Sequence, residues 1–323
     1  MRMLITGAGG AAAISIWKSL SAEHELHMAD IDPLASGLYL VPPDRRLIIP
    51  RGDSPELVPA LLRACEERRI EALVPTVDVE LAPLAAARDT CEAIGVALAI
   101  SPVECLDTCR DKQLLLDAVR GQVPIPDSEP LTEAVAARVD SFPRFAKPRE
   151  GAGSRGIARI DSRADLDGQP RDGSVMLQEY LPGEEYSVDI YVRRDGRVIA
   201  AVPRVRMKVD SGIAVASRTV EAPEVVEAAV RTAEIIGIRG AANVQFKRGA
   251  DGVFKLLEVN PRYPGTLPLT GAAGVDIPRL MAAELAGQAL PDGLLPFREL
   301  MVVRYWTEHY LDPGEWDALC PQP

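Results

Sequence analysis

The chain carries, at residues 257–262, the stretch Leu257-Glu258-Val259-Asn260-Pro261-Arg262. Residues two apart on an extended strand point the same way, so Glu258, Asn260 and Arg262 would share one face while the apolar residues between them face a core. Carboxylate and amide oxygens suit Mg²⁺, and a guanidinium suits phosphate. The stretch therefore predicts a strand with a metal- and phosphate-binding face. The alternative is a sheet face that is merely polar and solvated.

A second strand is predicted just before this one, at residues 242–247, and the turn Gly249-Ala250-Asp251-Gly252 follows it. A four-residue hairpin loop would pair even positions of one strand with odd positions of the other. Gln245 would then lie on the same face as Glu258 and Asn260. A one-residue bulge would reverse this register, so the placement of Gln245 depends on the turn.

The composition describes a folded chain with room for more than one core. Of its 323 residues, 47% are apolar and 26% are charged, and this length exceeds what one core usually serves. The net charge of −11 argues against a nucleic-acid partner but permits a local basic pocket. No apolar run approaches the roughly 20 residues of a membrane span, and no signal peptide is evident. We therefore expect a cytoplasmic protein without a membrane partner.

The first hundred residues alternate short apolar strands with helices, which predicts a parallel sheet covered on both faces. Beyond residue 102 a helical stretch and a proline-rich loop are expected, the strands come closer together from 142 to 220, and a helix is expected at 222–237. The strands of the first region are expected at 3–6, 25–30, 47–49, 72–75 and 96–100, with helices at 11–20, 54–68 (capped by Ser54) and 79–94. A helix at 277–286 and a strand at 300–306 are expected near the end.

Two glycine-rich loops are candidates for anion binding. Residues 7–10 follow a strand and open a helix, and Asp30 closes the next strand, as in dinucleotide-binding folds. Ala12, however, stands where the third glycine of that fingerprint belongs. An NAD(P)-dependent oxidoreductase is therefore an alternative, although it would leave the face of residues 258–262 unexplained.

The second loop, residues 151–156, lies between two predicted strands and therefore indicates a flap over phosphates. It is not a Walker A loop, because Ile157 stands where a lysine is required. Lys147 precedes the flap, where its ammonium could meet a phosphate. Further on, the backbone of residues 178–181 could read an adenine edge, and Glu185 could take ribose hydroxyls or be a plain surface acid.

These features resemble, in their order along the chain, the ATP-grasp superfamily, and particularly one synthetase half of the carbamoyl phosphate synthetase large subunit. The resemblance covers roughly residues 1–290 and implies an α/β ATP-grasp fold with an N-terminal, Rossmann-like parallel-sheet domain. The motifs that carry it are Asp111-Lys112, Lys147-Pro148, residues 151–156, Gln178-Glu179-Tyr180-Leu181, Gly183-Glu184-Glu185-Tyr186, Asn243-Val244-Gln245-Phe246 and residues 258–262. The domains implied are 1–105 (pre-ATP-grasp), 106–295 (ATP-grasp, with a flap or lid subdomain at about 123–181 and a metal-bearing one at about 182–295) and 296–323 (C-terminal strand and tail).

The resemblance also implies a role for each matching residue. Catalysis would involve Arg262, which steadies the transferred phosphate, with Lys147 and either Arg206 or Lys208, between which the sequence does not decide. Paired Mg²⁺ ions, for which Mn²⁺ could substitute, would bind Gln245, Glu258 and Asn260. The residues implied for ATP are Lys112, Lys147, Gly151, Gly153, Ser154, Gly156, Gln178, Glu179, Tyr180, Leu181 and Glu185.

Substrate residues are expected at the carboxyl edge of the first sheet, where ligands of such sheets usually bind. The candidates are Gly9, Gly10, Thr76, Asp78 and Glu80. Capping of the following helix by Thr76 or Asp78 is an equally good interpretation.

The function implied is an ATP-dependent carboxylate–amine, or carboxylate–thiol, ligase that acts through an acyl phosphate and releases ADP and phosphate. The expected partners are a small-molecule carboxylate and an amine, and a homodimer is compatible with this interpretation. Alternatives are carbamoyl phosphate or acyl phosphate synthesis without an organic amine, and a nucleotide-binding protein without catalysis. The chain matches only one synthetase half and no glutamine amidotransferase, so bicarbonate phosphorylation is less expected. The sequence identifies neither the acid nor the amine.

Overall fold

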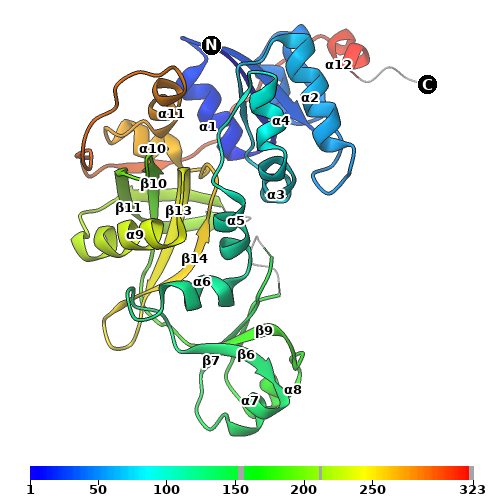
Figure 1. The fold of residues 1–323 in the computed structure, drawn as a ribbon. Coiled ribbons are helices and arrows are strands. Elements are labelled where there is room, and N and C mark those ends of the chain that lie inside the picture. Colours follow the sequence, from blue (N-terminus) through cyan, green and yellow to red (C-terminus); the bar gives the residue numbers. More distant parts are fainter. Residues whose placement is uncertain (152–155, 211–212, 320–323) are drawn as a thin grey trace.

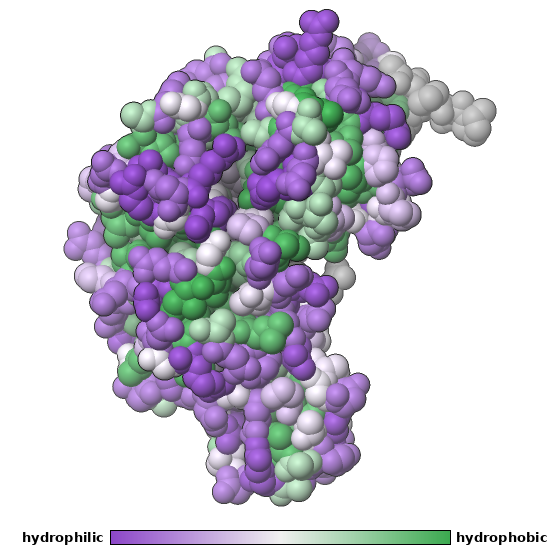
Figure 2. Space-filling view, in the orientation of Figure 1, coloured by the Kyte–Doolittle hydropathy of each residue, from purple (hydrophilic) through white to green (hydrophobic). Residues whose placement is uncertain are grey.

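The computed structural model describes residues 1–151, 156–210 and 213–319. Three sheets follow one another down an elongated molecule, as Figure 1 shows. The five-stranded N-terminal sheet lies at one end, a six-stranded sheet lies in the middle, and a four-stranded sheet forms the narrow lobe at the other end (Figure 2). This architecture confirms the predicted α/β fold, while the domain boundaries stay a prediction. Within the described ranges, no helix is long and apolar enough to cross a membrane.

The N-terminal sheet is wholly parallel, as predicted, with strand order β3-β2-β1-β4-β5. Its central strand is buried on both faces: Met3 and Ile5 enter one core and Leu4 enters another, as expected for a parallel sheet covered by helices. The strands are β1 (Arg2–Thr6), β2 (Glu25–Asp30), β3 (Arg46–Ile48), β4 (Ala72–Val74) and β5 (Ala97–Leu98). The helices are α1 (Ala11–Leu20), α2 (Leu57–Arg68), α3 (Asp78–Ala86) and α4 (Arg88–Ala93).

Two helix predictions in this region are wrong in detail. The helix expected at 54–68 begins at Leu57, and Ser54 does not cap it, because the Ser54 hydroxyl accepts the amide of Glu56 in a turn before the helix. The helix expected at 79–94 is divided into α3 and α4 at Ala87, whose φ of −94° and ψ of 11° are not helical.

The six-stranded sheet has the order β14-β13-β10-β11-β12-β15. Helix α9 (Pro223–Ile236) packs on one face, while α10 (Leu267–Ala272) and α11 (Ile277–Leu285) pack against α1 and join this sheet to the N-terminal region. The strands are β10 (Glu185–Val192), β11 (Val198–Asp210), β12 (Ile213–Thr219), β13 (Gly240–Arg248), β14 (Phe254–Asn260) and β15 (Met301–Val303). The strand expected at 300–306 is thus shorter, and the tail forms a helix, α12 (Pro313–Leu319).

The β13–β14 hairpin contains two irregularities that offset each other. Arg248 pairs with Phe254, which makes the loop one residue longer than the four predicted. A bulge then leaves Leu257 without a cross-strand partner and restores the predicted pairing of even with odd positions: Gln245 pairs with Glu258, whereas a four-residue loop would have placed it opposite Leu256. The predicted face is therefore right, although the predicted loop is wrong.

The four-stranded sheet and its small core form the lobe, in strand order β6-β9-β7-β8. Its β7 and β8 pair antiparallel on either side of the glycine loop, as predicted for a flap between strands. The lobe contains β6 (Ser128–Thr132), α7 (Glu133–Arg138), β7 (Arg144–Pro148), β8 (Ala158–Ile160), α8 (Arg163–Asp167) and β9 (Asp172–Glu179). Helices α5 (Val103–Arg110) and α6 (Lys112–Val119) lie between the N-terminal sheet and this lobe in sequence.

Candidate active site

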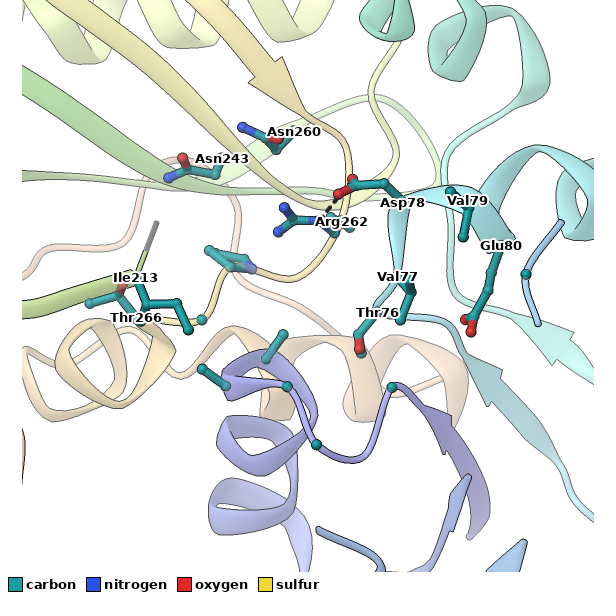
Figure 3. A pocket seen from close by; sticks show the side chains of 18 of the residues that line it. Thr76, Val77, Asp78, Val79, Glu80, Ile213, Asn243, Asn260, Arg262 and Thr266 are labelled. Carbon is teal, nitrogen blue, oxygen red and sulfur yellow. Dashed lines mark hydrogen bonds and ion pairs between the residues drawn. The ribbon is translucent and has the colours of Figure 1, made fainter. Parts of the chain in front are cut away.

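A cavity of about 550 Å³ lies between the N-terminal sheet and the six-stranded sheet. One wall consists of the turns at the carboxyl ends of β1, β2 and β4, and the opposite wall consists of the polar face of β10, β11, β13 and β14 (Figure 3). All five predicted substrate residues line it: Gly9, Gly10, Thr76, Asp78 and Glu80. The cavity therefore joins two segments that lie far apart in the sequence.

The predicted metal ligands gather where β13 and β14 pair. Gln245 Nε2 donates to Asn243 Oδ1 at 3.2 Å, and Asn260 Nδ2 donates to Glu258 Oε1 at 3.2 Å. Because the amide nitrogens are engaged in this way, the carbonyl oxygens of Gln245 and Asn260 are left for a cation. One carboxylate with two amide oxygens is a hard donor set that fits Mg²⁺, which keeps part of its shell for waters and phosphates. Among the described residues, no three acidic, histidine or cysteine side chains form a metal cluster.

Two buried lysines lie beside this edge. Lys147, on β7, is 6% exposed, and its Nζ donates at 3.1 Å to the carbonyl of Leu257, the residue in the bulge. Burial lowers the pKa of Lys147 to about 8; Glu258 opposes this shift and Lys112 adds to it. Lys112 Nζ donates to the carbonyl of Gly151 at 2.9 Å. Two neighbouring ammonium groups at the base of a glycine loop suit a polyphosphate.

The predicted adenine-binding linker is tied to its surroundings by side chains. The Glu179 carboxylate accepts hydrogen bonds from Lys255 Nζ at 2.5 Å and from the backbone amide of Asp127 at 3.1 Å. Tyr180 lies under the Arg159 guanidinium, with 4.5 Å between Cζ and the ring centroid, and Leu181 is buried. Gln178 is also buried, and its Oε1 has no hydrogen-bond partner among the described residues. The linker is thus held in place before any base binds.

Of the two basic candidates on β11, only Arg206 lines the cavity, and Lys208 is exposed outside it. Arg206 Nη1 donates at 2.7 Å to Glu185, the residue predicted to bind ribose. The flap residues Gly151 and Gly156 are described, whereas Gly153 and Ser154 lie outside the described residues.

Arg262, just beyond β14, joins the two walls. Its Nε donates to Asp78 Oδ1 at 2.8 Å, and Figure 3 shows this pair crossing the cavity. Helix capping by Asp78 or Thr76 is therefore the wrong alternative: Val77 is the N-cap of α3, without a side-chain cap, and the Thr76 hydroxyl donates to the Thr6 carbonyl at 2.8 Å.

Glu80 lies in the first turn of α3 and is 3% exposed. It accepts a hydrogen bond from the hydroxyl of Thr6. Burial raises the pKa of Glu80 to about 7, and the nearby carboxylate of Asp30 adds to the shift. Asp30 accepts the amide of Gly9 at 2.8 Å, so the first glycine turn is fastened to the end of β2.

Sequence reasoning missed a second row of polar residues on the sheet wall. Arg204 lines the cavity and pairs with the fully buried Asp189 at 3.2 Å, and Asn243 Nδ2 donates to the same carboxylate at 2.8 Å. Ser187 also lines the cavity, directly opposite Arg204 across the β10–β11 ladder. The signal was available, because Arg204 and Arg206, like Ser187 and Asp189, alternate along a strand and so share a face.

Two known protein families match separate parts of the chain. Residues 171–309 match a family described as ATP-grasp in the biosynthetic pathway with Ter operon, and residues 3–99 match the PylC-like N-terminal domain. A D-alanine–D-alanine ligase from Thermotoga maritima is 28% identical over 211 residues, which cover 58% of this chain and 69% of that protein. The carbamoyl phosphate synthase large chain of Clavibacter michiganensis is 27% identical over 189 residues, 51% of this chain and 17% of that one.

Biotin carboxylase from Campylobacter jejuni is similar in structure, with a TM-score of 0.74 and 19% identity, over 90% of this chain and 72% of that one. The chain has the ATP-grasp fold, and its residues 171–309 match an ATP-grasp family. It is an enzyme of the ATP-grasp ligase class, which forms carbon–nitrogen bonds with the use of ATP. The oxidoreductase and the non-catalytic alternatives are therefore wrong.

Proposed function

We propose that this enzyme activates a carboxylate as an acyl phosphate and transfers the acyl group to an amine. The observation that carries this proposal is the convergence of Lys147, Glu258 and Arg262 at one end of β14, beside a cavity with room for small substrates. Lys147 reaches the carbonyl that precedes Glu258, and Arg262 follows the same strand into the cavity. A cationic centre thus adjoins both a metal edge and a substrate space.

The nucleotide would lie between the lobe and the six-stranded sheet. Lys112 and Lys147 would hold its phosphates, with the flap from Gly151 to Gly156 above them. The linker 178–181 would receive the adenine, and Glu185 the ribose. Two Mg²⁺ ions held by Gln245, Glu258 and Asn260 would offset the negative charge of the β- and γ-phosphates.

In the first step, an oxygen of the substrate carboxylate forms a bond to the γ-phosphorus while the bond to ADP breaks. In the second, the nitrogen of a neutral amine bonds to the acyl carbon, inorganic phosphate leaves, and the nitrogen loses a proton. Arg262 can grip two phosphoryl oxygens in both steps, and Arg206 adds positive charge at the cavity. One such preorganised donor is typically worth about 2.7–4 kcal/mol of barrier.

A screen for ADP release tests the proposal. Carboxylic acids, amines and thiols are supplied singly and in acid–nucleophile pairs with MgATP, and the mass of each product is measured. We expect ADP release that requires both partners and a product that lacks one water relative to their sum. ADP release with an acid alone, unchanged by any amine, would replace the proposal with acyl phosphate synthesis. Thiol-dependent release would replace the amine with a thiol.

A further inference from the structure

The N-terminal wall of the cavity carries two carboxylates that have no cationic partner among the described residues. Glu80 receives only the hydroxyl of Thr6, and Asp30 receives only the backbone amides of Gly9 and Asp32, at 2.8 and 3.0 Å. Both line the cavity at one sheet edge: Asp30 ends β2 and Glu80 follows β4, the two strands that flank β1. They interact electrostatically with each other.

This wall differs from the surroundings of Asp189, another buried carboxylate, in the hydrogen-bond partners that it provides. Asp189 is 0% exposed, but Arg204, Asn243 and Thr270 all donate to it. A buried carboxyl without a cation is costly to ionise, and burial accordingly raises the pKa of Glu80 to about 7. Because Glu80 lies in a cavity and not in a closed core, a ligand can supply the missing positive charge.

The chemistry of the wall favours an organic cation over a metal ion. Ca²⁺ takes six to eight oxygen ligands, whereas no third acidic, histidine or cysteine side chain joins these two within the described part of the chain, and the predicted Mg²⁺ edge lies on the opposite, sheet wall. An ammonium group carries one charge and three donors. The Glu80 and Asp30 carboxylates, which influence each other electrostatically, offer acceptor oxygens for such donors.

The position of Glu80 separates this site from the reacting centre. Asp78 and Glu80 are two apart in the first turn of α3, so their side chains diverge. Asp78 reaches Arg262, whereas Glu80 turns toward Thr6 at the end of β1 (Figure 3). An amino group held at Glu80 is thus away from the phosphoryl centre, and it anchors the substrate without being the nucleophile.

We propose that Glu80 and Asp30 form an ammonium subsite, and that the carboxylate substrate is an amino acid whose amino group binds there while its carboxylate extends toward Arg262. This inference rests on the proposed ligase function. It narrows the acid, which the sequence leaves open, to a compound that carries a protonated amine. Asp30, which resembles a ribose-binding acid, would bind the substrate amine instead.

Equilibrium binding to a matched pair of variants tests the subsite. Glu80→Gln keeps the volume and an acceptor for Thr6 but removes the charge. Asp53→Asn is the control, because Asp53 also lines the cavity but is exposed and pairs with Arg51 at 3.2 Å. Calorimetry with the standard amino acids and their des-amino counterparts, without nucleotide and with Mg·AMP-PNP, measures each affinity.

We expect wild type to bind at least one amino acid on the order of tenfold to a hundredfold more tightly than its des-amino counterpart. Glu80→Gln should abolish that preference, and Asp53→Asn should keep it. Wild type that binds no amino acid, or Glu80→Gln that keeps the preference, would overturn the subsite, as would NADH binding that depends on Asp30. Because the assay needs no turnover, Glu80-dependent binding without ADP release in any pair would refute only the ligase proposal.

Discussion

The two walls of the cavity differ in how their buried charges are balanced. On the sheet wall, each of these charges has an opposite charge from the protein itself. Arg204 pairs with Asp189, Arg206 pairs with Glu185, and Lys147 interacts electrostatically with Glu258. On the N-terminal wall, Glu80 is almost fully buried, and its one hydrogen-bond partner among the described residues is the hydroxyl of Thr6. The first wall is organised before any ligand arrives, whereas the second is completed by its ligand.

This difference suits the two kinds of ligand. A nucleotide is shared by all reactions of the superfamily, and its phosphates need a fixed array of charge, which strands of one sheet provide at low reorganisation cost. Substrates differ from one enzyme to another, and the turns at a sheet edge bind them. Variants of the sheet wall should therefore affect reactions of the nucleotide, whereas variants of the N-terminal wall should affect binding of the substrate.

The largest effect is expected for Glu258→Gln on the sheet wall. The change removes the only carboxylate of the predicted metal edge, while the adenine and ribose contacts remain. We expect kcat to fall on the order of a thousandfold and nucleotide affinity to fall far less. Steady-state ADP release and calorimetry with MgATP measure the two quantities, with Glu227→Gln on the exposed face of α9 as control. Near wild-type ADP release in Glu258→Gln would remove this edge from the mechanism.

Arg262→Lys tests whether the residue that joins the walls serves the phosphoryl group. A guanidinium can grip two oxygens at once, whereas an ammonium is a point charge on a flexible stem. We expect turnover to fall on the order of a hundredfold with MgATP affinity nearly unchanged, because the lost contact matters most in the transition state.

The alternative is that Arg262 serves only its ion pair with Asp78, which is partly exposed and so worth about 0–1 kcal/mol. Asp78→Asn separates the two interpretations, since it breaks the pair but leaves the guanidinium. If Arg262→Lys and Asp78→Asn reduce kcat equally and slightly, Arg262 only connects the walls.

The sheet wall was largely predictable, and the reason is its regularity. Alternation along a strand predicts which side chains share a face, so Glu258 and Asn260 could be assigned to one face from the sequence alone. Gln245 was correctly predicted to share the face of Glu258, but through a loop of the wrong length that a bulge at Leu257 offsets. Local pattern does not reveal such a bulge, because tertiary contacts such as Lys147 with the Leu257 carbonyl accompany it.

The N-terminal wall was predictable only as a location. The end of β4 indicates where a ligand binds, yet nothing in Thr76-Val77-Asp78-Val79-Glu80 reveals that Asp78 meets Arg262 and that Glu80 is buried without a cation. Those facts depend on Thr6 and Arg262, which are 74 and 184 positions away along the chain. The pair of Asp189 and Arg204 is more local, since these residues are 15 apart on the neighbouring strands β10 and β11, and alternation along each strand indicates their shared face.

Glu80→Gln should change how stability depends on pH, because the folded-state pKa of about 7 lies above the ordinary value of 4.5. Between these values the unfolded chain loses this proton while the folded protein keeps it, so stability is lost as pH rises through that window. We expect wild type to lose about 3 kcal/mol more than Glu80→Gln between pH 4.5 and 8. Urea unfolding at several pH values measures the difference, and parallel curves for the two proteins would contradict it.

The smallest expected effect is the uptake of a fraction of a proton by Lys147 when MgATP binds. With its pKa near 8, this lysine is about half protonated at pH 8 without nucleotide. Phosphates beside it favour the charged form, so MgATP binding at pH 8 should take up about half a proton. Calorimetry in buffers of different ionisation enthalpy measures this uptake. Lys147→Arg, which is always charged, should bind MgATP without it, and equal uptake in both proteins would exclude Lys147 as its source. An amino acid that binds at Glu80 near pH 7 should release a proton instead, so the two walls predict proton exchange of opposite sign.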